Sequence, residues 1–249
     1  MKGFASRSVA GLVFTCIASG ICDRELAAQE ATHLYVSPKI NVTFSSPNEN
    51  SRTPLEDFVV VRRVRGNPVV DPPVEKMPKT VRARLDAQGV SPRISMLVKG
   101  NTFEVVAADA QQTADHNIYV EWFNNSYRGF TPRLDPPLLF QRSIDRSEPG
   151  LMKIKCNIHD DIVGYLLVTE QGFAAVTDDD GNGVLNKWPA GKQSVNLFHP
   201  DYSFVNADAF VNGDKVLLDR SRLTIEISAT PLQLHFVGLR KKESSWPNR

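Results

Sequence analysis

Three side chains with metal-binding chemistry stand in a short pattern in the middle of the chain. Cys156 and His159 are separated by two residues in the phrase Cys156-Asn157-Ile158-His159, and His116 lies well upstream in the pair His116-Asn117. A thiolate is a soft ligand that favours Cu(I), and imidazole suits both oxidation states of copper. One sulfur and two nitrogens in a near-trigonal set therefore suit a copper ion that exchanges one electron with little rearrangement.

Other interpretations of the same three residues stay open. Zinc also binds cysteine and histidine, but a structural zinc site normally has four protein ligands, and the pattern supplies three. The residues are also compatible with an empty site that keeps the motif as a remnant. Copper, another metal and no metal are thus the three alternatives.

The number of cysteines favours a ligand role for Cys156. The chain has three cysteines, and two of them, Cys16 and Cys22, lie in the N-terminal region. A single thiol in the body of a protein from an oxidising compartment is exposed to oxidation and mispairing, which ligation of a metal prevents.

The N-terminus has the features of an export signal. A basic start is followed by a short apolar run over 9–18, which is too short to span a bilayer comfortably. We expect a cleaved signal within 1–28, with cleavage after Gly20 or near Ala28, and a periplasmic or secreted protein without a membrane span. An uncleaved anchor and a lipid anchor on Cys22 are the alternatives.

The elements that must position the three side chains are strands. Residues 151–156 alternate so that Met152, Ile154 and Cys156 share one face, which places the thiol inward at a strand end. Another strand is predicted over 117–122, directly after His116. In a β-sandwich, two such strand ends lie side by side at one pole, so the sequence predicts that the three donors meet there.

Composition fits an all-β protein of moderate size. The chain has 249 residues, of which 41% are hydrophobic and 23% charged, with 16 prolines and 15 glycines among many short apolar runs. Lysine and arginine total 29 against 28 acidic residues, a balance that argues against a dedicated nucleic-acid binder. No nucleophile elbow, phosphate-binding loop or metalloprotease motif is found, so we expect a protein that is not an enzyme.

The predicted organisation has five parts. They are a signal peptide over 1–28, N-terminal strands and a proline-rich linker over 29–79, a first β-sandwich over 80–170, a second over 171–239 and a polar, frayed tail over 240–249. A strand, turn and strand are predicted over 94–106, and a long strand-free connection over 123–149.

These motifs resemble a known family. The matching phrases are Asp115-His116-Asn117, Cys156-Asn157-Ile158-His159-Asp160-Asp161-Ile162 and Gly164-Tyr165-Leu166-Leu167-Val168. With them, residues 84–170 resemble the cupredoxin superfamily, most closely the plastocyanin/amicyanin-like domains of exported methylamine-utilisation-like proteins. Residues 173–178 and 188–191 are similar to a transthyretin-like, or carboxypeptidase-regulatory-like, domain. The resemblance implies a cupredoxin-like Greek-key sandwich followed by a transthyretin-like sandwich.

The resemblance also implies roles for individual residues. His116, Cys156 and His159 fall on the three strong copper ligands, with one copper per chain, while Ile162 occupies the position of the family's axial methionine. Asn117 is implied as the neighbour that fastens the two ligand loops and supplies an amide near the sulfur. The first function hypothesis is a type 1 (blue) copper protein that carries one electron to and from a redox partner protein.

The second hypothesis is a copper-free structural or interaction module, whose second sandwich binds a partner or a carbohydrate. A copper-storage role is a third, which the chain's four methionines make less favourable.

Two further features are given non-ligand roles. The acidic run Asp178-Asp179-Asp180-Gly181-Asn182-Gly183 resembles the start of a calcium loop, but Pro189 stands where a glutamate ligand is needed, so a tight hairpin turn is predicted. His199 and His235 are predicted as surface or edge residues.

Overall fold

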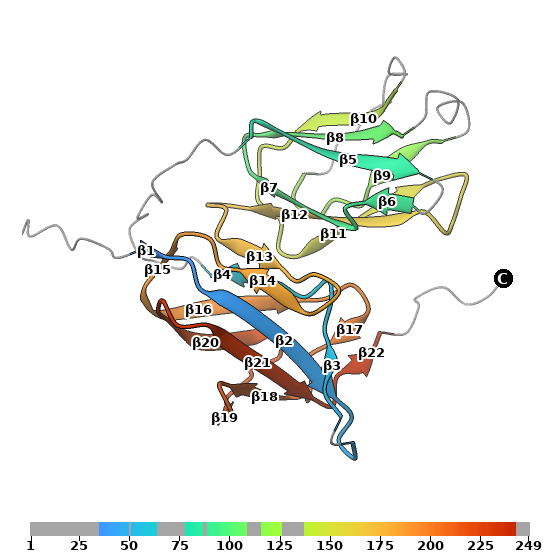
Figure 1. Cartoon of the computed structure of the whole chain (residues 1–249). Helices are drawn as coiled ribbons and strands as arrows, with labels where there is room; N and C mark the ends of the chain where they lie inside the picture. The colour runs from blue at the N-terminus through green and yellow to red at the C-terminus, as the bar shows by residue number, and fades with distance from the viewer. Residues whose placement is uncertain are drawn as a thin grey trace, which may run out of the picture. The chain divides into compact units, whose positions relative to one another are not determined.

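The prediction of an all-β fold is confirmed by the computed structural model of the chain (Figure 1). The structure describes residues 35–49, 51–63, 78–86, 89–108, 116–125 and 137–242. Strands, turns and bends make up this part of the chain, without a helix. The signal predicted over 1–28 and most of the proline-rich linker lie outside the described residues.

Two four-stranded sheets, which we call sandwich A, carry the cysteine and the two histidines. One sheet has the order β10-β8-β5-β6 and comprises Leu138–Ser143, Thr102–Ala107, Thr80–Asp86 and Gly89–Ser91. The other has the order β7-β12-β11-β9 and comprises Ile94–Val98, Val163–Thr169, Leu151–Cys156 and Ile118–Val120. The inner faces of both sheets contribute to one hydrophobic core, so the two sheets pack face to face.

The strand, turn and strand predicted over 94–106 are confirmed as β7 and β8. β7 pairs in parallel with β12 and β8 pairs in parallel with β5, so the turn at Gly100 carries the chain from one sheet to the other. The connection over 123–149 needs correction, because it contains β10 (Leu138–Ser143), an edge strand beside β8.

Two further sheets form what we call sandwich B. One has the order β13-β4-β16-β20 and comprises Ala174–Val176, Val59–Arg62, Gly191–Phe198 and Arg222–Ile227. The other has the order β14-β2-β21-β18-β19, with β3 beside β2, and comprises Asn182–Val184, Lys39–Ser45, Leu232–Val237, Asp208–Val211, Asp214–Val216 and Thr53–Pro54. A single hydrophobic core again contains residues of both sheets.

The N-terminal strands are central parts of sandwich B. β2 lies in parallel with β21 near the C-terminus, with Val42 opposite Leu234, and β4 lies between β13 and β16. β1 (Tyr35–Val36) pairs with β15 (Trp188–Pro189). The sequence predicts these strands but does not show their place in the sheets, because every partner other than β3 lies more than a hundred residues away along the chain.

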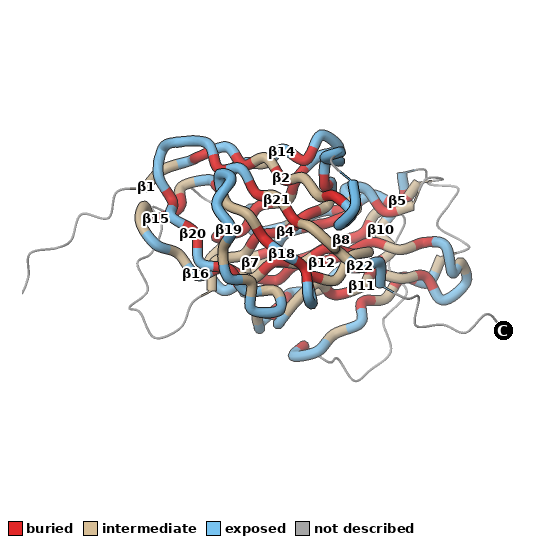
Figure 2. The backbone as a smooth tube through the Cα atoms, turned by 90° about the horizontal axis from the view of Figure 1, so that it is seen from below, coloured by how far each residue is buried: buried red, intermediate tan, exposed pale blue. Residues whose placement is uncertain are grey.

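Side chains of the two sandwiches meet within the compact unit His33–Arg249. A third apolar cluster joins Ile94, Tyr165 and Leu167 of sandwich A to Val59 and Ala174 of sandwich B. Buried positions recur along the strands and exposed positions gather in the connecting loops (Figure 2).

The start of the predicted frayed tail is ordered. β22 (Arg240–Lys241) pairs with β17 (Tyr202–Ser203), while residues 243–249 lie outside the described residues. The described residues form no helix with the length and apolar character needed to cross a membrane.

Candidate metal centre

Cys156 is the last residue of β11 and points into the core of sandwich A. Met152, Ile154 and Cys156 are buried, whereas Leu151, Lys153 and Lys155 are half-buried on the other face, as the alternation predicts. The cysteine is a free thiol and is 4% exposed. The adjacent Lys155 lies on the other face of the strand and pairs with Glu121. The hydrogen bond of this pair raises the pKa of Lys155.

His159 lies in the turn that follows β11. The backbone N–H of Ile162 donates to the carbonyl of His159 at 3.3 Å, which closes the turn. This geometry brings His159 Nδ1 to 3.7 Å from Cys156 Sγ. The backbone N–H of Ile158 also points at the sulfur, with the nitrogen 3.4 Å from Sγ.

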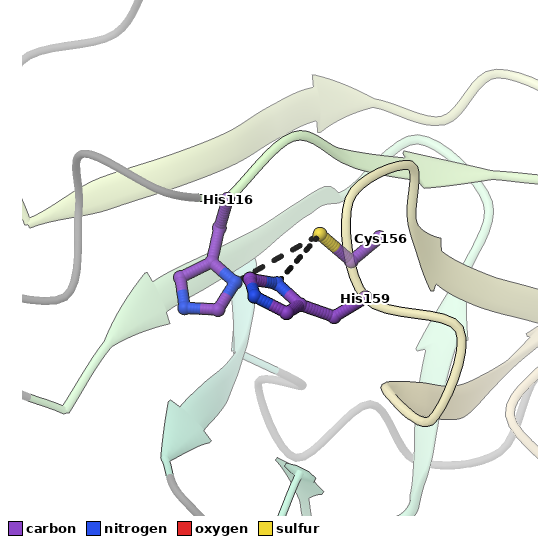
Figure 3. Close-up of side chains that lie close together, drawn as sticks. All are labelled: His116, Cys156 and His159. Atoms are coloured by element: carbon purple, nitrogen blue, oxygen red, sulfur yellow. Dashed lines mark hydrogen bonds between the residues drawn. The ribbon is translucent and has the colours of Figure 1, made fainter.

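His116 comes from the neighbouring strand. β9 is antiparallel to β11 and places Ile118 opposite Cys156, so His116 lies two residues further on, beside the loop of His159. The backbone N–H of Asn157 donates to the Asn117 carbonyl at 3.0 Å. This hydrogen bond continues the pairing of β9 with β11 beyond the ends of the strands. His116 Nδ1 lies 3.8 Å from Cys156 Sγ, and Figure 3 shows both imidazole rings turned toward the sulfur.

The sulfur lies at similar distances from the two histidine nitrogens, as it would around a shared ion. An ion bonded to sulfur at about 2.3 Å and to nitrogen at about 2.0–2.1 Å, with about 120° between the bonds, holds the two donors about 3.8 Å apart. The observed sulfur–nitrogen distances are 3.8 Å and 3.7 Å, and the ligand atoms of all three residues lie within 4.8 Å of one another. The two sulfur–nitrogen spacings therefore match those around a small thiophilic metal ion.

A fourth strong ligand is not found in the part of the chain that the structure describes. The cluster of histidine, cysteine and carboxylate groups there comprises His116, Cys156 and His159 alone. A zinc ion would need a further donor from water, whereas one thiolate with two imidazoles is a complete strong-ligand set for copper. The donor chemistry thus fits copper better than structural zinc.

The position that the resemblance assigns to an axial methionine holds Ile162. This side chain is 8% exposed and belongs to the same core cluster as Cys156. Met152 shares the inner face of β11, but four residues separate it from the thiol, roughly 13 Å along a strand. The thioether of Met152 is therefore too far away to replace the missing donor.

Asn117 joins the two ligand segments through its main chain. Its carbonyl accepts the N–H of Asn157, and its side chain is exposed. An amide near the sulfur is supplied by Ile158. No feature of the sequence distinguishes Ile158 for this role, because the contact depends on the path of the backbone and not on the side chain.

The acidic run of sandwich B is a turn, as predicted, but not a hairpin. Asp178 Oδ1 accepts the backbone N–H groups of Asp180 and Asn182, so its carboxylate caps the turn. The flanking strands β13 and β14 pair with β4 and β2, which belong to different sheets. Gly181 has φ of +71° and approaches the carbonyl of Val42, where a Cβ would lie 2.3 Å from the oxygen.

The prediction of a surface role for His199 is wrong. The residue is 3% exposed and its ring nitrogens bond to backbone groups of Glu56, Asp201 and Tyr202. His235 lies on the outer face of its sheet as predicted, but it is half-buried and bonded to two hydroxyl groups. Neither histidine belongs to the cluster around Cys156.

A buried carboxylate that the sequence does not single out fixes the loop after β9. Glu148 is 8% exposed and accepts the backbone N–H groups of Phe123, Asn124 and Asn125 together with the Asn125 side-chain amide. Its surroundings are backbone amides, so its role is to hold this loop.

Comparison with known proteins assigns no family to the chain. No protein-family model matches it, and no curated protein matches it.

Proposed function

We propose that the protein binds one copper ion through His116, Cys156 and His159 and carries single electrons. The observation that supports this most strongly is the convergence of one thiol and two imidazoles at sulfur–nitrogen distances of 3.7 Å and 3.8 Å. Bound copper would supply the one-electron redox chemistry that none of these side chains provides alone.

The residues of the chain would contribute geometry and shielding. Cys156 is anchored by the β11 ladder, and His116 lies two residues before β9, which pairs with β11. The Ile158 N–H would reduce the negative charge on the sulfur, an interaction of the kind that tunes redox potential. The buried side chain of Ile162 would keep water away from the thiolate.

We also propose that sandwich A is a cupredoxin-type domain and that residues 171–239 belong to a transthyretin-like domain. The support is the motif resemblance together with two sheets that share one core, one of which carries the cluster at the end of β11. A lone cysteine in the body of the chain and the signal-like N-terminus support an exported, periplasmic or secreted protein.

The test is copper titration of the purified chain with visible absorption as the readout. We expect an intense sulfur-to-copper charge-transfer band that saturates at one copper per chain and is absent from Cys156→Ser. A matched control, His235→Gln, should keep the band, because this described histidine is not part of the cluster.

The copper-free module remains the second candidate, and the observation that favours it is the apolar Ile162 at the expected axial position. A protein that stays colourless, and whose thermal unfolding does not change with copper, would contradict the electron-carrier proposal and support this module.

A further inference from the structure

The outer face of the β2-containing sheet in sandwich B carries a row of amide side chains. Asn182, Asn41 and Gln233 lie opposite one another on β14, β2 and β21, and Asn212 follows in the turn after β18. Asn41 donates to Asn182 Oδ1 at 2.9 Å, and Asn212 Oδ1 accepts the backbone N–H of Gln233 at 2.9 Å. Neighbouring groups thus hold Asn41 and Asn212 in place.

A second row on the same face combines hydroxyl side chains with one imidazole and one phenyl ring. Thr43, His235 and Phe210 lie opposite one another on β2, β21 and β18. The His235 ring is fixed by Thr43 Oγ1 at 2.9 Å and by Ser45 Oγ at 3.2 Å. Its centroid is 6.1 Å from that of the Phe210 ring, which is half-buried and leaves part of an apolar surface beside the polar groups.

Apart from Asn182, the residues of the two rows line a groove of about 620 Å³, a size typical of small-molecule sites. The charged residues in its lining are Glu49 and Arg52, whose charges cancel. Burial, with a smaller contribution from Arg52, lowers the pKa of His235, so this ring is neutral at neutral pH. The groove therefore offers many hydrogen-bonding groups and no net charge.

We propose that this groove binds a neutral oligosaccharide. Amide and hydroxyl side chains both donate and accept hydrogen bonds, which matches a sugar hydroxyl that does the same. Side chains already held by their neighbours lose little conformational entropy when a ligand binds. The ring of Phe210 supplies the apolar surface on which the C–H face of a sugar rests. An anionic ligand would instead need an excess of positive charge, which the lining lacks.

The proposal is tested with four neutral tetrasaccharides, namely maltotetraose, cellotetraose, mannotetraose and chitotetraose, added separately to the full chain. Saturation-transfer NMR detects binding and calorimetry gives the affinity. We expect at least one of the four to bind, and Gln233→Ala and Phe210→Ala to weaken it by about tenfold or more. The matched control is Thr224→Ala, at an exposed position on β20 of the other sheet.

The outcomes separate this site from the metal centre. Cys156→Ser should bind the tetrasaccharide as the unchanged chain does, because the cysteine lies in sandwich A. Three results would each overturn the proposal. They are the absence of binding by all four tetrasaccharides, equal affinity in Gln233→Ala and Thr224→Ala, and tighter binding of a sulfated heparin tetrasaccharide. Far-ultraviolet circular dichroism of each variant establishes that a loss of binding is not a loss of fold.

Discussion

Ile162 is the residue that distinguishes the candidate centre from a site with a thioether donor. It is buried in the same core cluster as Cys156 and offers no lone pair. A weak axial donor stabilises Cu(II) more than Cu(I), so a centre with three strong ligands and an apolar fourth side favours the reduced ion. In the proposed function, this residue would raise the reduction potential of the bound copper.

Replacing Ile162 by methionine tests this role. Under copper loading, Ile162→Met should have a lower reduction potential than Ile162→Leu, because only the methionine can donate a sulfur lone pair to Cu(II). The two variants have similar side-chain volumes, which makes leucine the matched control. Spectroelectrochemical titration measures both potentials, and equal values would show that residue 162 does not face the metal.

The sequence predicts that His116, Cys156 and His159 converge, but it does not predict the groups that surround them. The spacing of Cys156 and His159, and the position of His116 before a strand, are local features that predict three donors at one pole. The Ile158 N–H that points at the sulfur and the burial of His199 depend on backbone groups whose position no local pattern encodes.

At the scale of elements, Gly164 allows β6 to lie against β12. A Cβ on Gly164 would be 2.8 Å from Cβ and Cγ1 of Val90, closer than two carbon atoms can approach. Gly164 lies opposite Ile154 on β11, so the contact is next to the strand that carries Cys156. Close packing of these strands is therefore part of what holds the thiol in position.

Gly164→Ala should lower the free energy of unfolding by about 1–3 kcal/mol, because the added methyl group overpacks the site. In a Val90→Gly background the same change should cost less, since the Cβ and both methyl groups of Val90 are gone. Urea unfolding of the four proteins in this cycle measures the difference. An equal cost in both backgrounds would show that Val90 is not the side chain that glycine accommodates.

Strands were predictable where alternation is strong, and their partners were not. The structure confirms the strands predicted at β11 (Leu151–Cys156) and β21 (Leu232–Val237), where buried and more exposed residues alternate. β10 was missed because it is an edge strand with mixed burial inside a polar, proline-marked segment. The parallel pairing of β2 with β21 depends on contacts distant in sequence, which periodicity cannot specify.

At the scale of the whole molecule, His199 ties together segments that are far apart in the chain. Its Nδ1 accepts the N–H groups of Asp201 and Tyr202, so the ring proton resides on Nε2, which donates to the Glu56 carbonyl at 2.9 Å. Lys242 Nζ donates to the His199 carbonyl at 2.6 Å. The ring must be neutral for these bonds to form together.

Acidification should therefore destabilise the fold through His199. The pKa of His199 is lowered mainly by burial of the ring and also by the positive charge of Arg93. The hydrogen bond from the ring to Glu56 and the negative charges of Asp201 and Asp57 raise this pKa, but burial has the largest effect. The pKa of His199 in the folded state lies below its unfolded value of about 6.5. As the pH falls below about 6.5, the unfolded chain therefore binds more protons at this residue than the folded chain does. The free energy of unfolding then decreases.

His199→Asn provides the comparison for this pH dependence, since its amide oxygen can accept a backbone N–H but does not titrate. Denaturant unfolding between pH 7.5 and 5 should show a steeper loss of stability in the unchanged chain than in the variant. Parallel curves would contradict a role for this histidine, because all other titrating groups are common to both proteins.

Copper K-edge X-ray absorption of the copper-loaded full chain tests whether the three donors bind one ion. The expected spectrum shows one sulfur and two imidazole nitrogens around copper, with the sulfur signal lost in Cys156→Ser. A copper shell of nitrogen and oxygen alone, unchanged in that variant, would contradict the proposed metal centre.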